Sequence, residues 1–316
     1  MLLRTLKSLI EYCFFVPVNF LARRCSYGRA GRLGSALGGI VWRRIPYRKE
    51  VSRDNLRLAF PAMAPGAIDA IAEGAYRGYG RALMEMLWSG GAGEDDLRAA
   101  MTLANPEVPL GALARGKGLV LLSGHFGAWE LVVTSLPLLL GHPVTAIAQP
   151  QRNRFIDRVI TANRNRFGSG TVTMHRAPRE VTALLREGKI VAMLGDQSGP
   201  KESTFVEFFG RPAATHRGPA AFSLRCDAPL VMFFFIRQGD GTYRAVFEEV
   251  DRSGLGGTSE EAIVELTRRH TAVLERFIRA WPDHWLWMHR RWKHTAYYEA
   301  MAGSPRHGEP AGEDAR

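Results

Sequence analysis

One stretch of the chain, LVLLSGHFGAWEL at positions 119–131, restricts the possible fold more than any other. Its first four residues are apolar, a run long enough for a buried strand and too short for a helix. Ser123 and Gly124 break the run, and the apolar residues 131–140 that follow predict a helix. The sequence therefore places His125 in the turn between a parallel strand and a helix, where open α/β sheets bind ligands.

His125 and Glu130 are the first candidate catalytic pair. Five positions on a helix are a rotation of about 500°, so the two side chains would not share a helix face. We expect them to meet only if His125 lies in the turn and Glu130 on the first helical turn. A carboxylate there would fix the imidazole tautomer and raise its basicity. Gly127 and Gly124 keep the backbone bare for a substrate. The alternative is a histidine that only hydrogen-bonds within its turn.

Strand and helix patterns alternate along most of the chain. Strands are predicted at 144–148, 189–194 and 229–236, with a hairpin leading into 243–250. Helices are predicted at 65–90, 94–103, 153–167, 179–186, 218–225 and 259–280. This order predicts an α/β fold with a mixed, mostly parallel sheet flanked by helices. We expect the catalytic domain to span residues 51–302 and the polar tail, residues 303–316, to be disordered.

The N-terminal segment, residues 1–50, is predicted to associate with a membrane. Residues 2–22 are apolar and aromatic but are interrupted by Arg4, Lys7, Glu11 and Pro17, and arginines follow from Arg23 onward. This pattern favours a helix lying in or dipping into a bilayer surface, with arginines on the lipid phosphates. The alternative is an amphipathic helix packed on the protein body. No small-residue cleavage site follows, which argues against a removable signal peptide.

The charge of the chain favours acidic partners. Lys and Arg total 42 and Asp and Glu total 31, giving a net charge of +11. Nucleic acid is not expected, because the arginines are scattered among apolar and tryptophan-rich stretches without a recognised binding module. No metal is expected either, since His284, His289 and His294 recur every five residues and do not share a helix face.

A tryptophan-rich segment, PDHWLWMHRRWK at 282–293, leaves two interpretations open. Together with Trp281 it holds four of the seven tryptophans. Tryptophan beside arginine suits an interface with lipid head groups or the mouth of an apolar channel. The same residues also fit a closing core helix with a basic outer face.

Four motifs in order resemble those of the lipid A biosynthesis acyltransferase family. They are SGHFGAWEL, GDQ at 195–197, FVEFFGRPA at 205–213 and HWLWMHRRWK at 284–293, and RDNLRLAFP at 53–61 resembles the family's N-terminal element. This family adds lauroyl or myristoyl groups and is related to the glycerolipid acyltransferases. The resemblance implies a glycerolipid acyltransferase-like fold. It also implies acyl transfer from a thioester of acyl carrier protein or coenzyme A to a lipid hydroxyl, with no further cofactor.

The resemblance also assigns roles to individual residues. His125 would be the general base, and Glu130 would orient it. Arg166, or alternatively Arg164, would meet the acceptor phosphate or the developing oxyanion. Glu207 matches a position where some relatives carry a second acid, and its presence leaves open whether the acceptor is lipid A or another glycolipid.

The remaining expectations concern substrates and location. Asp196 and Gln197 of the GDQ motif are candidate substrate-binding residues, together with Gly127. The expected acceptor is a phosphorylated glycolipid, at the cytoplasmic face of the inner membrane. A serine esterase is disfavoured because the chain has no Gly-x-Ser-x-Gly motif. The competing hypotheses are an acyl thioester hydrolase in which His125 activates water, an acyltransferase with a different lipid acceptor, and a non-catalytic lipid-binding protein.

Overall fold

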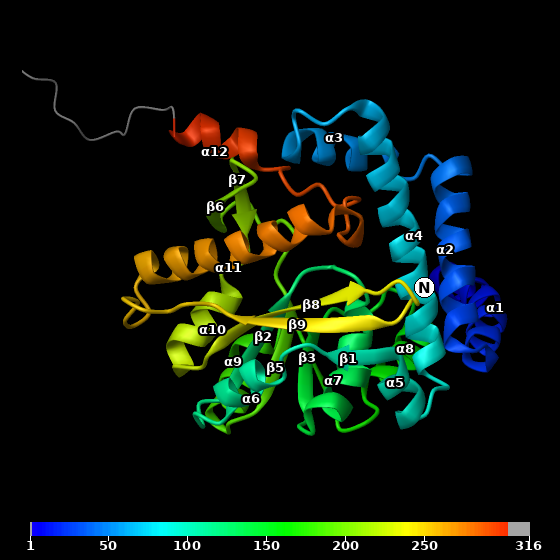
Figure 1. Cartoon of the computed structure of the whole chain (residues 1–316), viewed down its shortest axis with the longest axis horizontal. Helices are drawn as coiled ribbons and strands as arrows, with labels where there is room; N and C mark the ends of the chain where they lie inside the picture. The colour runs from blue at the N-terminus through cyan, green and yellow to red at the C-terminus, as the bar shows by residue number, and fades with distance from the viewer. Residues whose placement is uncertain (1, 303–316) are drawn as a thin grey trace, which may run out of the picture.

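The strands of the central sheet send alternate side chains to two separate hydrophobic cores. In β2 (Leu119–Ser123), Leu119 and Leu121 face one core, whereas Val120 and Leu122 face the other. Both faces of the sheet are therefore covered, which produces the helix–sheet–helix layering of this computed structural model (Figure 1). The structure describes residues 2–302, so the predicted disordered tail lies outside the described residues.

The main sheet has seven strands in the order β1-β9-β8-β2-β5-β3-β4. All neighbouring pairs are parallel except β8 and β9, which form the predicted antiparallel hairpin. This confirms the prediction of a mixed, mostly parallel sheet. The other six strands are β1 (Met101–Leu103), β3 (Val144–Ala148), β4 (Gly170–Thr173), β5 (Ile190–Leu194), β8 (Leu230–Arg237) and β9 (Tyr243–Glu249).

Helices cover the two faces of the sheet in two groups. One face carries α9 (Ala177–Arg186), α10 (Gly218–Cys226) and α11 (Glu260–Ala280). The other carries α5 (Glu94–Ala100), α6 (Glu107–Leu113) and α7 (Val132–Leu140), the last preceded by the 3₁₀ turn η1 (Trp129–Leu131). A two-stranded hairpin of β6 (Thr204–Phe208) and β7 (Arg211–Thr215) lies beyond α11, next to α12 (Thr295–Ala302) (Figure 1), and the short 3₁₀ turn η2 (Pro282–His284) follows α11 and contacts α4.

Some predicted elements were wrong at their ends or were missed. The helix predicted at 94–103 ends at Ala100, and the chain continues as β1, which pairs with β9. The pattern at 94–103 could not reveal this edge strand, because its three residues are held by a partner far along the chain. Strands β4, β6 and β7 were not predicted either, and each has only four or five residues.

The N-terminal helices pack at one end of the sheet. They are α1 (Leu2–Arg24), α2 (Tyr27–Arg44), α3 (Lys49–Ala59) and α4 (Pro65–Ser89). Glycines let α2 and α4 approach closely: a Cβ on Gly34 would lie 2.4 Å from the carbonyl oxygen of Gly80, and a Cβ on Gly80 would lie 2.3 Å from that of Gly34. The glycine-rich part of the N-terminal segment, in α2, therefore packs closely against α4.

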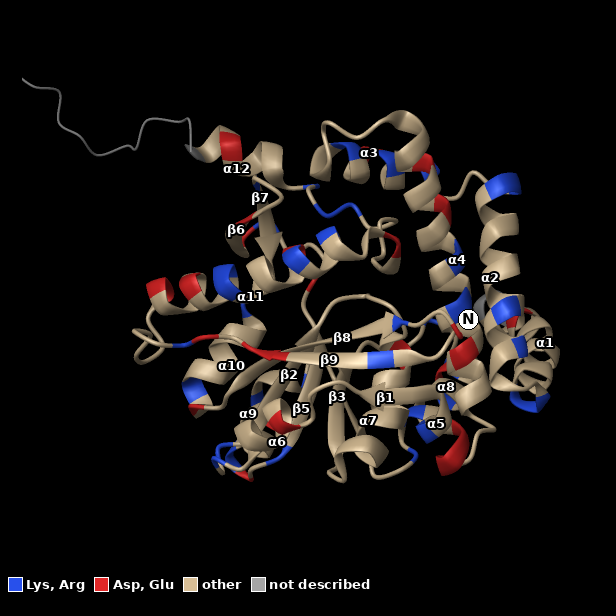
Figure 2. Ribbon diagram, viewed as in Figure 1, with Lys and Arg blue, Asp and Glu red and all other residues tan. Residues whose placement is uncertain are grey.

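The outer sides of α1 and α2 are apolar and exposed. On α2 this side carries Leu33, Leu37 and Ile40, and Figure 2 shows Lys and Arg at both ends of the helix. Residues 5–24 of α1 are long and apolar enough to cross a membrane, with a mean hydropathy of 1.2 and 6% of the stretch buried. The inner side of α1 contacts α8 (Arg154–Arg164), where Asn153 donates to the Ser8 carbonyl and Tyr12 packs on Phe155.

Candidate active site

His125 and Asp196 come together because their strands are neighbours in the sheet. Strands β2 and β5 are parallel and pair Ser123 with Leu194, so the residues two positions further along meet at the same edge. The imidazole Nδ1 of His125 lies 2.8 Å from Oδ1 of Asp196, and the His125 backbone N–H donates to Oδ2 at 2.8 Å. The turn after β2 thus carries a histidine paired with a carboxylate, as predicted. The carboxylate, however, comes from the turn after β5, the neighbouring strand in the sheet.

The surroundings of this pair favour a charged Asp196 and a basic His125. Burial opposes the charged carboxylate, but the charge and hydrogen bonds of His125 and a hydrogen bond from the Trp285 indole lower the pKa of Asp196 below its usual range. Burial alone would lower the pKa of His125, but the charge and hydrogen bond of Asp196 and the charge of Glu130 raise it above its usual value. Because a carboxylate only accepts, Nδ1 carries the hydrogen and Nε2 is left as the basic nitrogen.

The basic nitrogen of His125 faces a pocket of about 460 Å³. Gln197 lies beside it, with its Nε2 3.3 Å from Nε2 of His125, and the histidine side chain is 21% exposed and so remains accessible. The polar lining comprises His125, Glu130, Gln149, Gln151, Arg164, Gln197 and His216. The rest is mainly apolar and includes Ile147, Met174, Met193, Pro219 and Phe222. Among the described residues that line the pocket there is no serine or cysteine.

Glu130 reaches the same pocket but does not orient His125. As predicted, His125 lies in the turn and Glu130 lies on the first helical turn, η1. However, both carboxylate oxygens of Glu130 accept hydrogen bonds from Arg164, at 2.8 and 3.0 Å. Nδ1 of His125 is already bonded to Asp196, so the prediction that Glu130 accepts a hydrogen bond from the imidazole was wrong. Glu130 and Arg164 instead form an ion pair at the pocket wall, with side chains 18% and 12% exposed.

Arg166 and Glu207, two other predicted site residues, lie outside the pocket lining. The guanidinium of Arg166 donates to the carbonyl of Ser89, the last residue of α4, and to that of Ala92 in the loop that follows. Glu207 is exposed on β6, opposite Pro212, and makes no hydrogen bond to His125 within the described residues. The carboxylate that bonds the imidazole is therefore that of Asp196, and neither Glu130 nor Glu207 has this role.

Gly127 serves packing against the sheet. It has φ +58°, and a Cβ there would lie 2.0 Å from the Phe235 carbonyl oxygen, so a side chain cannot be accommodated. Its N–H donates to the His284 carbonyl at 2.9 Å. We expected the space beside Gly127 to be open to a substrate, but the backbone of Phe235 occupies it.

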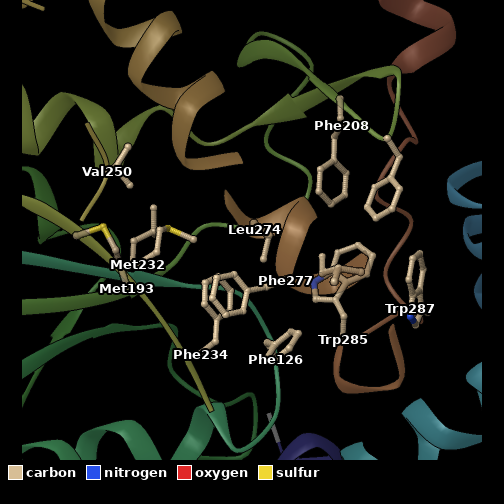
Figure 3. Close-up of a cluster of buried hydrophobic side chains, with 14 of the residues drawn as sticks. Phe126, Met193, Phe208, Met232, Phe234, Val250, Leu274, Phe277, Trp285 and Trp287 are labelled. Atoms are coloured by element: carbon tan, nitrogen blue, oxygen red, sulfur yellow. The ribbon is translucent and has the colours of Figure 1, made fainter. Parts of the chain in front are cut away.

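The tryptophan-rich segment is buried, although it forms no continuous helix. After η2 it runs as an irregular loop in which Trp285, Trp287 and Trp292 are 8% exposed or less. These three tryptophans do not form a lipid-facing surface, because they are buried. Their burial agrees with the core interpretation, but the segment is not the closing helix that this interpretation expected. Figure 3 shows Trp285 beside Phe126 and Phe208. Phe126 belongs to residues 124–128, the turn that carries His125 and that we call the catalytic turn, and it forms a β-bridge with Trp285.

Sequence reasoning missed two features of the site. The indole of Trp285 donates a hydrogen bond to Asp196, and His216 lines the pocket. The only signal for Trp285 was its place in a motif shared with the family, and none marked His216. For a metal, the described residues 2–302 contain no group of three or more His, Cys, Asp or Glu placed to hold one.

A histidine paired with a buried aspartate, in a pocket whose described lining has no serine or cysteine, is an arrangement found in transferases and hydrolases in which an external hydroxyl group or water attacks. The comparisons resolve the class. Residues 4–294 match the model of the bacterial lipid A biosynthesis acyltransferase family, so the chain belongs to this family and is an acyltransferase.

The individual relatives have low sequence identity, but two of them match most of the chain. The chain is similar to a lipid A biosynthesis lauroyltransferase of Escherichia coli, 26% identical over 88% of this chain and 90% of that protein. It is similar to a lipid A biosynthesis palmitoleoyltransferase of the same species, 24% identical over 83% and 84%. A phosphatidylinositol mannoside acyltransferase of Mycolicibacterium smegmatis is 26% identical over 57% of this chain and 59% of its own.

Proposed function

We propose that the protein transfers a fatty acyl group from an acyl thioester to a hydroxyl of a lipid A precursor or a related glycolipid. The observation that carries this proposal is the His125–Asp196 pair, whose basic nitrogen faces a pocket lined by both polar and apolar side chains. The apolar side chains suit an acyl chain, and the polar ones suit a hydroxylated head group.

The reaction follows from the position of the base. Nε2 of His125 takes the proton of the acceptor hydroxyl while that oxygen attacks the thioester carbonyl. The new C–O bond forms, the C–S bond breaks, and the departing thiolate recovers the proton from the imidazolium. Asp196 stabilises the imidazolium through Nδ1 during this exchange. No group of the protein becomes acylated, which agrees with a pocket lining without serine or cysteine in the described residues.

The ion pair of Glu130 and Arg164 supports a phosphorylated acceptor. Arg164 presents a planar guanidinium at the pocket wall, a group that binds two phosphate oxygens at once. Glu130 holds this guanidinium in place until the acceptor arrives. The proposed donor is a thioester of acyl carrier protein or coenzyme A, and the net charge of +11 favours the acidic carrier.

We further propose a glycerolipid acyltransferase-like fold and attachment to the cytoplasmic face of the inner membrane. The support for attachment is the exposed apolar surface of α1 and α2 next to clustered arginines. α1 also packs beside α8, whose last residue is the pocket-lining Arg164. A lipid acceptor in the membrane surface would thus be near the pocket.

A second acceptor class is supported by one observation. One relative is named for acylation of a phosphatidylinositol mannoside, a glycolipid that is not lipid A. The test is acyl transfer by the purified full-length protein, followed by mass spectrometry of the lipids. Transfer to one acceptor and not the other assigns the class.

The same assay tests the mechanism and its main rival. We expect His125→Ala to lose about 10²- to 10⁴-fold of the transfer rate while the protein stays folded. A rate within a few-fold of wild type would rule out His125 as the base. Release of free fatty acid at the full rate without any acceptor would identify a thioester hydrolase instead.

A further inference from the structure

Two sequence motifs that have no part in the proposed chemistry meet directly behind the catalytic turn. Residues 282–289, which we call the buttress loop, pair with this turn through the backbone. Gly127 N–H donates to the His284 carbonyl at 2.9 Å, and Leu286 N–H donates to the His125 carbonyl at 3.1 Å. Between these bonds, Phe126 and Trp285 form an antiparallel bridge. The backbone of His125 is thus held by a segment about 160 residues away in sequence.

The indole of Trp285 connects the buttress loop to the carboxylate that pairs with His125. Its Nε1–H donates to Oδ2 of Asp196 at 2.8 Å, and both side chains are 2% exposed. The other two donors to this carboxylate belong to His125 itself. Trp285 is therefore the residue that fixes Asp196 independently of the histidine. Its ring packs against Phe208 and Trp287, at centroid distances of 5.7 and 4.7 Å (Figure 3).

The buttress loop is fastened in turn by the second motif, RDNLRLAFP, in α3. The side-chain amide of Asn55 donates to the carbonyls of Trp287 and His289 at 2.7 and 2.6 Å, and Asn55 is 4% exposed. At the end of the loop, Ser198 N–H donates to Nε2 of His289, whose pKa is lowered by burial to about 4. The neutral His289 thus ties the loop to the residues that follow Asp196.

We propose that Trp285 is a positioning residue for acyl transfer. Held by the buttress loop and Asn55, it orients Asp196 and sets the basicity of His125. This inference rests on the proposed role of His125 as general base. The pair carries one negative charge when the imidazole is neutral and none when it is protonated. A fixed N–H donor favours the negatively charged state, so Trp285 keeps His125 unprotonated at a lower pH than Asp196 alone would allow.

The test compares two buried tryptophans that each donate one hydrogen bond. Trp285→Phe removes the donor to Asp196, and Trp292→Phe removes a donor to the Phe208 carbonyl at 3.3 Å in the same aromatic cluster. The pKa of His125 is measured by NMR titration of the full chain with labelled histidine. We expect Trp285→Phe to raise it by about 0.5–1 unit. Trp292→Phe should leave it unchanged.

Kinetics provide a second readout. In Trp285→Phe the rising limb of kcat/KM against pH should move upward by the same amount as the pKa, and kcat should fall about ten- to a hundredfold through misplacement of the base. An unchanged His125 pKa in folded Trp285→Phe overturns the inference. Because the titration does not depend on turnover, absence of acyl transfer in the wild-type protein would overturn the proposed function alone.

If Trp285→Phe does not fold, Asp196→Asn decides the question from the other side of the hydrogen bond. In protein with labelled tryptophan, this substitution should shift the indole N–H resonance of Trp285 and speed its exchange with solvent. The resonance of Trp292 should not move. Equal behaviour of the two indoles would show that Trp285 is not bound to the Asp196 carboxylate in solution, and the inference would fail.

Discussion

Oε2 of Glu130 lies 2.8 Å from a terminal nitrogen of Arg164, so the acid of the His-x4-Glu motif is committed to an arginine and not to the imidazole. Two carboxylates therefore have separate tasks in one site. In the proposed mechanism, Asp196 supports the base His125, and Glu130 holds the guanidinium of Arg164 for a substrate group. This division predicts different kinetic signatures for the two acids.

Asp196→Asn should affect the chemical step, and Glu130→Gln should affect substrate binding. Without its charged partner, His125 loses stabilisation of the imidazolium, and we expect kcat to fall by about 10²-fold or more. Glu130→Gln leaves the base intact, so the main change should be an increase in KM for the acceptor. Steady-state kinetics with varied acceptor separate the two effects. An equal fall in kcat for both variants would contradict this division.

Arg164 and Arg166 should also differ, although they are two residues apart. Arg164→Ala should weaken acceptor binding and leave the melting temperature nearly unchanged, because its partner Glu130 is accessible from the pocket. Arg166→Ala leaves the carbonyls of Ser89 and Ala92 without their donor, which should cost about 2 kcal/mol of stability. Thermal melts and acceptor KM, measured side by side, test this. A reversed pattern would return Arg166 to the substrate site.

The activity should rise with pH through the pKa of His125. The base acts in its neutral form, and the charge of Asp196 raises this pKa above the ordinary value of about 6.5 despite the opposing effect of burial. The rising limb of kcat/KM should therefore lie above pH 6.5 in the wild-type enzyme. In Asp196→Asn the limb should move to lower pH, because the imidazolium loses its counter-charge. A limb that stays in place would assign it to another group.

The partner of His125 shows why the site could be predicted only in part. The sequence marked the end of each buried strand and the polar residues that follow. It did not give the order of strands in the sheet, and only the pairing of β2 with β5 makes Asp196 the neighbour of His125. Glu130 was the nearest acid along the chain, and local spacing favours such residues. The pairing of two strands far apart in the sequence instead makes Asp196 the partner of His125.

Arg166 illustrates a second limit, the position of helix ends. The predicted helix ran to residue 167, whereas α8 ends at Arg164. Arg164, the last residue of α8, reaches Glu130, whereas Arg166, beyond the end of the helix, reaches the carbonyl of Ser89 at the end of α4. The layered α/β fold, in contrast, could be predicted because its strands and long helices carry their own periodic patterns.

The glycines between α2 and α4 should be sensitive to a single methyl group. In Gly34→Ala the new Cβ would lie 2.4 Å from the Gly80 carbonyl oxygen, so the helices must separate, at a cost of about 2–3 kcal/mol. The control is Gly28→Ala on the same helix, where the nearest atom is the flexible end of Arg32 at 3.4 Å. That change should be neutral or stabilise by up to about 1 kcal/mol. Denaturant unfolding measures both, and equal stability of the two variants would refute close packing at Gly34.

The exposed apolar side of α1 should control membrane binding. Ile10, Phe14 and Leu21 are 51%, 75% and 61% exposed, and their replacement by serine removes apolar area without touching the side that packs on α8. Each large side chain contributes about 1.5 kcal/mol or more when buried in lipid, so the triple variant should bind vesicles at least about a hundredfold more weakly. Vesicle co-sedimentation of the full-length protein measures this change.

A matched control and a salt series distinguish apolar anchoring from charge attraction. Tyr297 and Met301 on α12 are also exposed, at 41% and 63%, but lie beside the β6–β7 hairpin and away from α1. Their replacement by glutamine should leave vesicle binding unchanged. Raising salt from 0.1 M to 1 M shortens the screening length from about 10 Å to about 3 Å and weakens only the contribution of arginines such as the exposed Arg24. If wild-type binding is lost entirely at high salt, the arginines and not the apolar side of α1 hold the protein on the membrane.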